Sequence, residues 1–235
     1  MLNVEIDLAG NLARVNEAIA DAAARAGRDP AEITLIGVSK THSAEEIARI
    51  VKAGLRHIGE NRVQEAAAKF PHAFELIDER PVCHMVGHLQ TNKAALALEL
   101  FDRIDSVDSL KLAQALARRV PEEKEVSVLV EVYVGDDPTR PGVRPPQVLD
   151  VVGKILEVPR VRVEGLMSVA PLGSDPRAAF AQVRQLKENL SAAFPALHFG
   201  VLSMGMSEDF VEAIAEGSTE VRIGTALFGP RNPRF

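Results

Sequence analysis

The sequence is poor in cysteine and in aromatic residues. Its 235 residues include one cysteine, one tyrosine and no tryptophan. The lone cysteine, Cys83, has no partner for an internal disulfide, which excludes a fold held together by disulfides. The shortage of aromatic rings argues against the stacking platforms that bind single-stranded nucleic acid.

Long apolar runs and clusters of basic charge are missing as well. No run is long enough to span a bilayer, and residues 1–15 lack the basic start and continuous apolar segment of a secretory signal. The 27 Lys and Arg residues are scattered along the chain and are outnumbered by 33 Asp and Glu residues. We therefore expect a cytoplasmic protein that binds neither nucleic acid nor membrane, and a monomer rather than a large oligomer.

The sequence does contain a regular alternation of short β-branched runs with longer amphipathic runs. The strand-like runs cover residues 33–40, 57–61, 82–88, 103–109, 126–134, 161–169, 198–205 and 220–229. Helix-like segments lie between them, and a further helix is predicted over roughly residues 5–26.

Eight strands joined by helical crossovers predict a parallel sheet with right-handed connections that closes into a (β/α)8 TIM barrel. We expect an α/β fold with an extra N-terminal helix, in one domain over residues 1–235. An open doubly wound sheet is the alternative. It is disfavoured because G-x-G-x-x-G does not follow the first strand and the Walker pattern is absent.

Lys40 is the last residue of the first strand-like run, and functional groups of such barrels lie at the carboxyl ends of the strands. Because side chains alternate along a strand, Ile36, Val38 and Lys40 share one face. If the first two fill the interior, Lys40 rises into the barrel mouth. Ser43 and Glu46 form an S-x-x-E capping box that starts the next helix. From this strand alone, a solvated lysine explains the residue equally well.

A lysine amine in such a mouth can attack a carbonyl and form a Schiff base once its pKa is lowered. The loops after the last two strands, which often hold phosphate, fall within residues 202–209 and 222–229. Their candidate groups are Gly205 and Gly224, which permit close backbone approach, and the hydroxyls of Ser203, Ser207 and Thr225. Glu208 and Asp209 would repel an anion from the following helix, so we expect hydroxyls and last-strand amides to dominate.

Arg222 lies inside the last strand, where a guanidinium is costly unless it is paired. Its structural partners could be Glu131 or Glu164, which are embedded in apolar strands. Its functional partner would be the ring nitrogen of a ligand lying across the mouth. Both interpretations stay open at this point.

Several other polar residues have ordinary explanations. His84 and His88 lie four residues apart on one predicted strand, about 13 Å, so they cannot share a metal ion and no metal site is expected. Cys83 fits a small core residue. The charged residues of segment 54–67 have the spacing of a solvated face, apart from Asn61 at the end of the second strand.

The motifs GVSKTHSAEEI, HIGENRVQEAAAKF, HMVGHLQTNKAA, VEGLMSVAP and LSMGMSEDFVEAIAEGSTEVRIGTALFG closely resemble those of the pyridoxal phosphate homeostasis protein family. The resemblance runs from about residue 5 to residue 230. It implies the barrel shared with the N-terminal domain of alanine racemase and the cofactor pyridoxal 5′-phosphate (PLP), bound as a lysine Schiff base.

The resemblance also implies roles for individual residues. Lys40 would carry the Schiff base, Ser207 with the backbone of Gly224 and Thr225 would hold the phosphate, and Arg222 would face the pyridine nitrogen. Ser203 and Asn61 would give supporting contacts. Where many relatives have lysine, this chain has Arg140 and His42. Since arginine cannot form a Schiff base, a lysine-to-lysine transfer is not expected here, although Arg140 can still attract phosphate.

The resemblance favours a non-catalytic carrier or buffer that delivers PLP to apo-enzymes. A cation beside the ring nitrogen disfavours its protonation and so weakens the ring as an electron sink. Racemases use a tyrosine from a second domain, whereas this chain ends six residues after Gly229 and its only tyrosine, Tyr133, closes the fifth strand. A PLP-dependent racemase and a Schiff-base aldolase acting on a phosphorylated sugar remain the alternatives.

Overall fold

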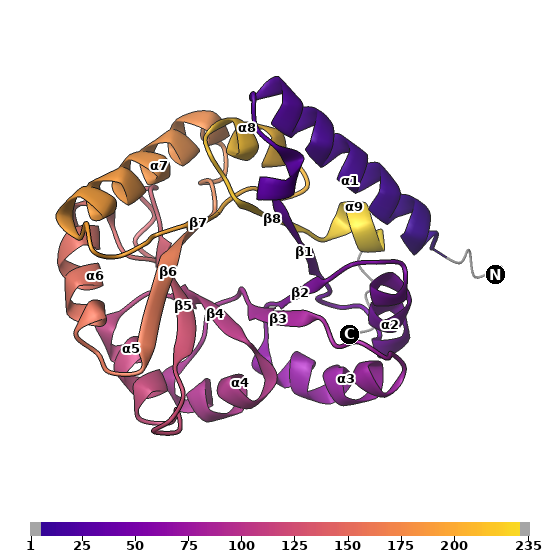
Figure 1. The fold of residues 1–235 in the computed structure, drawn as a ribbon, viewed down its shortest axis with the longest axis horizontal. Coiled ribbons are helices and arrows are strands. Elements are labelled where there is room, and N and C mark those ends of the chain that lie inside the picture. The colour runs from indigo at the N-terminus through magenta and orange to yellow at the C-terminus, as the bar shows by residue number, and fades with distance from the viewer. Residues whose placement is uncertain (1–5, 231–235) are drawn as a thin grey trace.

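The computed structural model describes residues 6–230 as a closed barrel of eight parallel strands in sequential order, ringed by helices (Figure 1). The strands are β1 (Thr34–Val38), β2 (His57–Glu60), β3 (Val82–Met85), β4 (Arg103–Val107), β5 (Val126–Val132), β6 (Val161–Ser168), β7 (Val201–Ser203) and β8 (Glu220–Ile223). β1 pairs with β8, with Leu35 opposite Val221, so the sheet has no open edge. This closure excludes the open doubly wound alternative.

The outer layer consists of one helix that precedes the first strand and of helices that follow the strands. They are α1 (Leu8–Arg25), α2 (Ala44–Lys52), α3 (Val63–Glu75), α4 (Ala94–Leu100), α5 (Leu110–Ala117), α6 (Val148–Leu156), α7 (Pro176–Ala193), α8 (Phe210–Ala215) and α9 (Thr225–Phe228). Short 3-10 turns cover Pro30–Glu32, Thr91–Lys93 and Pro145–Gln147. The extra helix α1 packs against α2, α8 and α9 on the outside of the barrel (Figure 1).

The barrel and its helices are held together by an apolar layer built from the outward face of the strands and the inward stripe of each helix. Gly37 illustrates how close this contact is, since a Cβ on that residue would lie 2.4 Å from Leu55 Cδ2. α2 begins with the predicted capping box: Ser43 N donates to Glu46 at 2.8 Å, and Glu46 N donates to Ser43 Oγ at 3.2 Å.

All the predicted strands are present, and each is shorter than predicted. The largest correction concerns residues 220–229, where β8 ends at Ile223 and a helical turn, α9, follows. The apolar run continues into α9 because Leu227 and Phe228 are buried against the barrel, so composition alone could not separate strand from helix. The predicted N-terminal helix starts at Leu8, after Asp7, whose side chain accepts from Gly10 N at 2.9 Å; residue 5 lies outside the described residues.

Within residues 6–230, none of the helices combines the length and the apolar character needed to cross a membrane.

Candidate functional site

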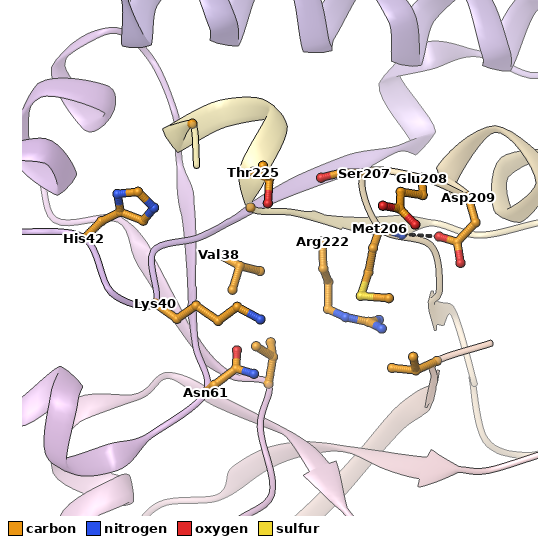
Figure 2. Close-up of a pocket in the computed structure, with 14 residues that line it drawn as sticks. Val38, Lys40, His42, Asn61, Met206, Ser207, Glu208, Asp209, Arg222 and Thr225 are labelled. Atoms are coloured by element: carbon orange, nitrogen blue, oxygen red, sulfur yellow. Dashed lines mark hydrogen bonds between the residues drawn. The ribbon is translucent and has the colours of Figure 1, made fainter. Parts of the chain in front are cut away.

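A cavity of about 320 Å³ opens at the carboxyl ends of the strands (Figure 2). It brings together the following residues that the sequence had singled out: Lys40, Asn61, Ser207, Arg222, Gly224 and Thr225. They come from the ends of β1 and β2, from the turn after β7 and from β8 with the start of α9. Segments more than 180 residues apart in sequence thus form one site, because closure of the barrel places the last strand beside the first.

Lys40 lies two residues beyond the end of β1, and its side chain extends into the cavity toward Arg222 (Figure 2). Val38 lines the cavity beneath it, and Ile36 is fully buried in the barrel. The alternation predicted for this strand is therefore confirmed. Thr41, the next residue, has a φ of 66°, an unusual left-handed conformation for a residue other than glycine.

The guanidinium of Arg222 is held by oxygen atoms of the two preceding strands. Its Nη1 donates to the carbonyl and the hydroxyl of Ser203, at 2.6 and 2.9 Å, and its Nη2 donates to the carbonyl of Ser168 at 2.8 Å. Burial lowers the pKa of Arg222, which the negative charges of Asp105 and Glu131 oppose. Arg222 lines the cavity although only 5% of the residue is exposed.

The two glutamates proposed as partners of Arg222 do different things. Glu164 pairs with Arg103 at 3.5 Å and with Arg162 at 2.9 Å, at the opposite end of the barrel, so the prediction of a pair with Arg222 is wrong for this residue. Glu131 attracts Arg222 electrostatically, but none of the ion pairs among the described residues joins the two. Carbonyl groups, rather than a carboxylate, are the direct partners of the guanidinium.

Ser203 does not line the cavity. It is fully buried behind Arg222, and its hydroxyl accepts a hydrogen bond from the guanidinium. The resemblance assigned the phosphate to Ser207 and only a supporting contact to Ser203, and Ser207 is the one that lines the cavity. In the structure the Ser203 side chain therefore supports Arg222, whereas the resemblance implied a supporting contact with the cofactor.

Hydroxyl and backbone groups gather at the other end of the cavity, where the turn after β7 meets the start of α9. Ser207 and Thr225 lie near each other there (Figure 2). Thr225 opens a helical turn, and the first amides of a helix have no partner within it. Asp209 accepts from Met206 N at 2.6 Å and already satisfies one amide of the preceding turn, in line with the expected minor role of the α8 terminus.

Gly205 shapes this turn. Its φ is +91°, and a Cβ there would lie 2.8 Å from Phe210 Cα and 2.6 Å from Ala213 Cβ. Its carbonyl accepts from Arg222 N at 3.0 Å. The glycine therefore allows the turn to fold tightly over the first residues of α8 and joins it to β8.

His42 is a lining residue that the sequence indicated only as a departure from lysine. It is 6% exposed, its ring stacks on Phe228 at 4.9 Å between centroids, and its Nδ1 lies 3.4 Å from Glu46. Burial lowers the pKa of His42, and the charge of Glu46 opposes this effect. The spacing of two residues from Lys40 is the signal that could have placed it here.

A carboxylate with a raised pKa lies near the end of β5. Burial first, and the charge of Asp108 second, raise the pKa of Glu131 to about 7, while Arg222 acts in the opposite direction. Asp108 pairs with His88 at 3.2 Å, which is half exposed. His88 therefore belongs to the carboxyl ends of the strands.

A second polar cluster fills the barrel interior at the amino ends of the strands, and the sequence did not indicate it. His57 Nδ1 lies 3.0 Å from His84 Nε2, and Arg103 donates to Asp105 at 2.7 Å and also contacts Glu220. Burial, with the charges of His84 and Arg103, lowers the pKa of His57 to about 4. These groups contact one another, although His84 Nδ1 has no hydrogen-bond partner among the described residues, and they lie at the end of the barrel away from the cavity.

Cys83 is buried in the core, as predicted, and burial raises the pKa of its thiol to about 12. It therefore provides no thiolate near neutral pH.

The cavity groups fit a small phosphorylated aldehyde. An amine on Lys40 can bond to a carbonyl carbon, the hydroxyls and amides around Ser207 and Thr225 can hold a phosphate, and the cation of Arg222 can donate to a ring nitrogen between them. The lining also includes apolar surface from Val38, Val86, Val169 and Met206, as expected for a flat ring.

Comparisons with known proteins agree with this arrangement. The family model described as alanine racemase, N-terminal domain, matches residues 11–232. The pyridoxal phosphate homeostasis protein of Escherichia coli is 39% identical over 232 residues, covering 96% of this chain and 97% of that protein. The protein of the same name from Aquifex aeolicus is 40% identical over 224 residues, covering 94% of this chain and 96% of that protein.

A solved structure of PipY from Synechococcus elongatus, with PLP bound, superposes with a TM-score of 0.82 at 38% identity and covers 95% of this chain and 100% of that chain. The agreement in fold, in length and in sequence extends over nearly the whole molecule. The chain therefore belongs to the pyridoxal phosphate homeostasis protein family, built on the barrel of the alanine racemase N-terminal domain.

Proposed function

We propose that this protein binds PLP through a Schiff base between Lys40 Nζ and the aldehyde of the cofactor, and that it serves PLP homeostasis in the cytoplasm as a carrier or buffer. The observation that supports this most directly is the convergence of Lys40, Arg222 and Ser207 on one cavity. The PLP-bound structure of PipY, 38% identical, gives independent support. Recipients would be apo-enzymes that need PLP.

Groups at different ends of the cavity would bind different parts of PLP. Ser207, with the backbone of Gly224 and Thr225, would donate hydrogen bonds to the phosphate and hold it. Asn61 would make a polar contact beside Lys40. Arg222 would donate to the pyridine nitrogen, its guanidinium kept in place by the carbonyls of β6 and β7. When bound, PLP can act as an electron sink for carbanions, and a cation at its nitrogen weakens that capacity.

The position of Tyr133 also favours a carrier over an enzyme. A racemase needs acid and base groups on both faces of the substrate carbon. Tyr133 is the one tyrosine of the sequence that could be such a group. Tyr133 is not among the residues that line the cavity, and its ring packs under the guanidinium of Arg144, 4.6 Å from Arg144 Cζ. Tyr133 therefore does not provide an acid or base group opposite Lys40 in the cavity.

Absorption spectroscopy with chemical trapping tests the proposal. Purified protein with added PLP should show a visible Schiff-base band that borohydride bleaches, and peptide mass analysis should locate the reduced adduct on Lys40. Lys40→Ala should abolish both signals, whereas Lys52→Ala, an exposed lysine of α2, should retain them. A colourless protein with no lysine adduct would contradict the binding proposal.

The carrier role has its own test. Protein loaded with PLP should activate a PLP-dependent apo-enzyme at the rate at which PLP leaves, and it should show no multi-turnover racemisation or keto-acid release with amino acids. Sustained turnover by the wild type that is lost in Lys40→Ala would overturn the carrier in favour of an enzyme.

A further inference from the structure

A buried ammonium group lies directly behind the cavity, on the side away from the cofactor position. It belongs to Lys69 of α3, which is 8% exposed. Its Nζ lies 2.6 Å from Glu60 Oε1 and 2.9 Å from Glu65 Oε1. It also donates to the carbonyls of Ser39 and His42, at 2.7 and 3.2 Å. The sequence suggested a solvated face here, and that interpretation is wrong for Glu60, whose side chain is fully buried.

This cluster adjoins the cavity through the two strand ends. Ser39 and Glu60 come immediately before Lys40 and Asn61, just where β1 and β2 end. Lys40 and Asn61 line the cavity, while Ser39 and Glu60 are fully buried, and the Ser39 hydroxyl donates to Glu60. One hydrogen-bonded unit therefore links the backbones that carry two cavity residues.

The cluster also clamps the turn on which Lys40 sits. Lys69 Nζ contacts a carbonyl at each end of residues 39–42, and Thr41 N donates to Glu65. Thr41 has its φ at 66°, a conformation that costs free energy and persists only where the surroundings enforce it. Lys69 and Glu65 are the side chains that enforce it, because between them they bind both the carbonyls and the amide of the turn.

Lys69 is poorly suited to a chemical role of its own. Its Nζ has four oxygen partners within 3.2 Å, two of them carboxylate oxygens, so every N–H group of Lys69 is already engaged in the cluster. Lys69 is not among the cavity-lining residues, whereas Lys40 is.

We propose that Lys69 is a positioning residue for Lys40: through the carbonyls of Ser39 and His42 and the carboxylate of Glu60, it holds the turn that aims the Lys40 amine at the carbonyl of the ligand. This rests on the proposed function of Lys40 as the Schiff-base lysine. The role is geometric, so it affects formation of the covalent bond and leaves phosphate recognition by β8 and α9 unchanged.

The test compares two ligands on the same variants. PLP can bond to Lys40, whereas pyridoxine 5′-phosphate has no aldehyde and reports only non-covalent binding. Lys69→Met should lower the early-time yield of borohydride-trapped Lys40 adduct, and so its rate of formation, about ten- to hundredfold, the order expected from misplacing a reacting group by about 1 Å. Its affinity for pyridoxine 5′-phosphate should stay within about twofold of the wild type.

A double variant separates positioning from loss of charge balance. Lys69→Met leaves Glu60 as a buried, uncompensated carboxylate, which is destabilising, whereas Glu60→Gln with Lys69→Met removes both charges. Both variants should lose adduct, because neither can bind the carbonyls of Ser39 and His42. Lys52→Met, exposed on α2, controls for the loss of one lysine.

The outcomes are distinct. If the wild type forms a Lys40 adduct and the double variant forms as much, Lys69 does not position Lys40. If affinity for pyridoxine 5′-phosphate falls in parallel with adduct yield, or if both variants fail to fold, the cluster is only a structural element and the proposal is overturned. If the wild type itself forms no adduct, the proposed function fails, and the positioning role fails with it.

Discussion

Arg222 Nη1 donates at once to the carbonyl and to the hydroxyl of Ser203, at 2.6 and 2.9 Å, so one buried serine provides two of the oxygens that hold the cavity's cation. Because the hydroxyl is fully buried, it can act only through the guanidinium. Ser207, four residues on, lines the cavity. Ser203 therefore supports the site by holding Arg222, whereas Ser207 is placed to contact the ligand.

Ser203→Ala should destabilise the protein by about 1.5–3 kcal/mol, the range for a hydrogen bond to a charged group, since the Nη1 group loses one acceptor in a buried place. Ser207→Ala should leave the free energy of unfolding within about 0.5 kcal/mol of the wild type, because Ser207 is partly exposed and lies outside the core, and should weaken binding of PLP and pyridoxine 5′-phosphate. Urea unfolding and ligand titration measure the two effects. The opposite pattern would show that Ser203 contacts the ligand.

The sequence predicted the barrel and most of the cavity because both follow from local patterns. β-branched runs separated by amphipathic segments specify eight parallel strands, and Lys40 and Arg222 are conspicuous as charges at or within apolar strands. Their meeting needed no long-range information beyond closure of the sheet. The same logic placed Asn61 at a strand end, whereas Thr225 was singled out for its hydroxyl in segment 222–229.

The features that the sequence did not predict depend on contacts between distant segments. Glu60 and Lys69 look like surface charges until α3 is packed against β2, and only then do they share a buried cluster. His57 and His84 likewise meet only through the register of β2 with β3. The burial and pairing of these four residues are consequences of tertiary packing. The residues next to them in the sequence do not reveal it.

Stability should depend on the charge state of Glu131. Burial raises its pKa from the ordinary 4.5 to about 7, so the folded protein keeps a proton there that the unfolded chain releases. The resulting stabilisation is complete below about pH 4.5 and is lost as the pH rises through about 7. Glu131→Gln stays neutral and should escape this loss.

Glu131→Gln should therefore gain stability relative to the wild type by about 1–3 kcal/mol between pH 5 and pH 8, since one pKa unit corresponds to about 1.4 kcal/mol. Urea unfolding at several pH values measures the difference. Glu123→Gln, at an exposed position before β5, is the control for removing one negative charge. Parallel curves for wild type and Glu131→Gln would rule out the raised pKa.

Gly205 should tolerate no side chain, for two separable reasons. Its φ of +91° strains any L residue, and a Cβ would collide with Phe210 and Ala213 of α8. Gly217 has nearly the same φ, +90°, but the nearest atom to its Cβ would be Arg184 Cδ at 3.5 Å. Comparison of the two positions therefore isolates the collision from the strain.

Gly217→Ala should cost about 1–3 kcal/mol from backbone strain alone. Gly205→Ala should cost more, and it should also weaken binding of pyridoxine 5′-phosphate because the turn that carries Ser207 must shift. Thermal unfolding and ligand titration decide this. Equal losses of stability with no change in binding would mean that the turn absorbs the new methyl group without moving Ser207.

The loop after β5, residues 135–146, is rich in Gly and Pro, as is common in mobile loops that open and close over a site. In the structure, hydrogen bonds tie its C-terminal part to the end of β5. Tyr133 N donates to Val143 O at 3.1 Å, and Val143 N donates to Glu131 O at 2.7 Å. Arg144 lies over the Tyr133 ring and binds the carbonyls of Asp137 and Arg140, at 2.8 and 3.1 Å. Arg144 is therefore the side chain that ties the exposed tip to the barrel.

Arg144→Ala should free the tip and, if the loop gates the cavity, speed the release of PLP several-fold. The loss of a half-buried cation–π contact and of two hydrogen bonds to carbonyls should cost about 1–3 kcal/mol of stability. Arg140→Ala is the matched control, because its backbone carbonyl still accepts in the loop while its exposed charge is removed. That variant should slow PLP association, more so at low salt, and leave release unchanged. Stopped-flow absorbance measures both rates. If Arg144→Ala lowers stability strongly without changing release, the loop is a brace for β5 and does not gate the cavity.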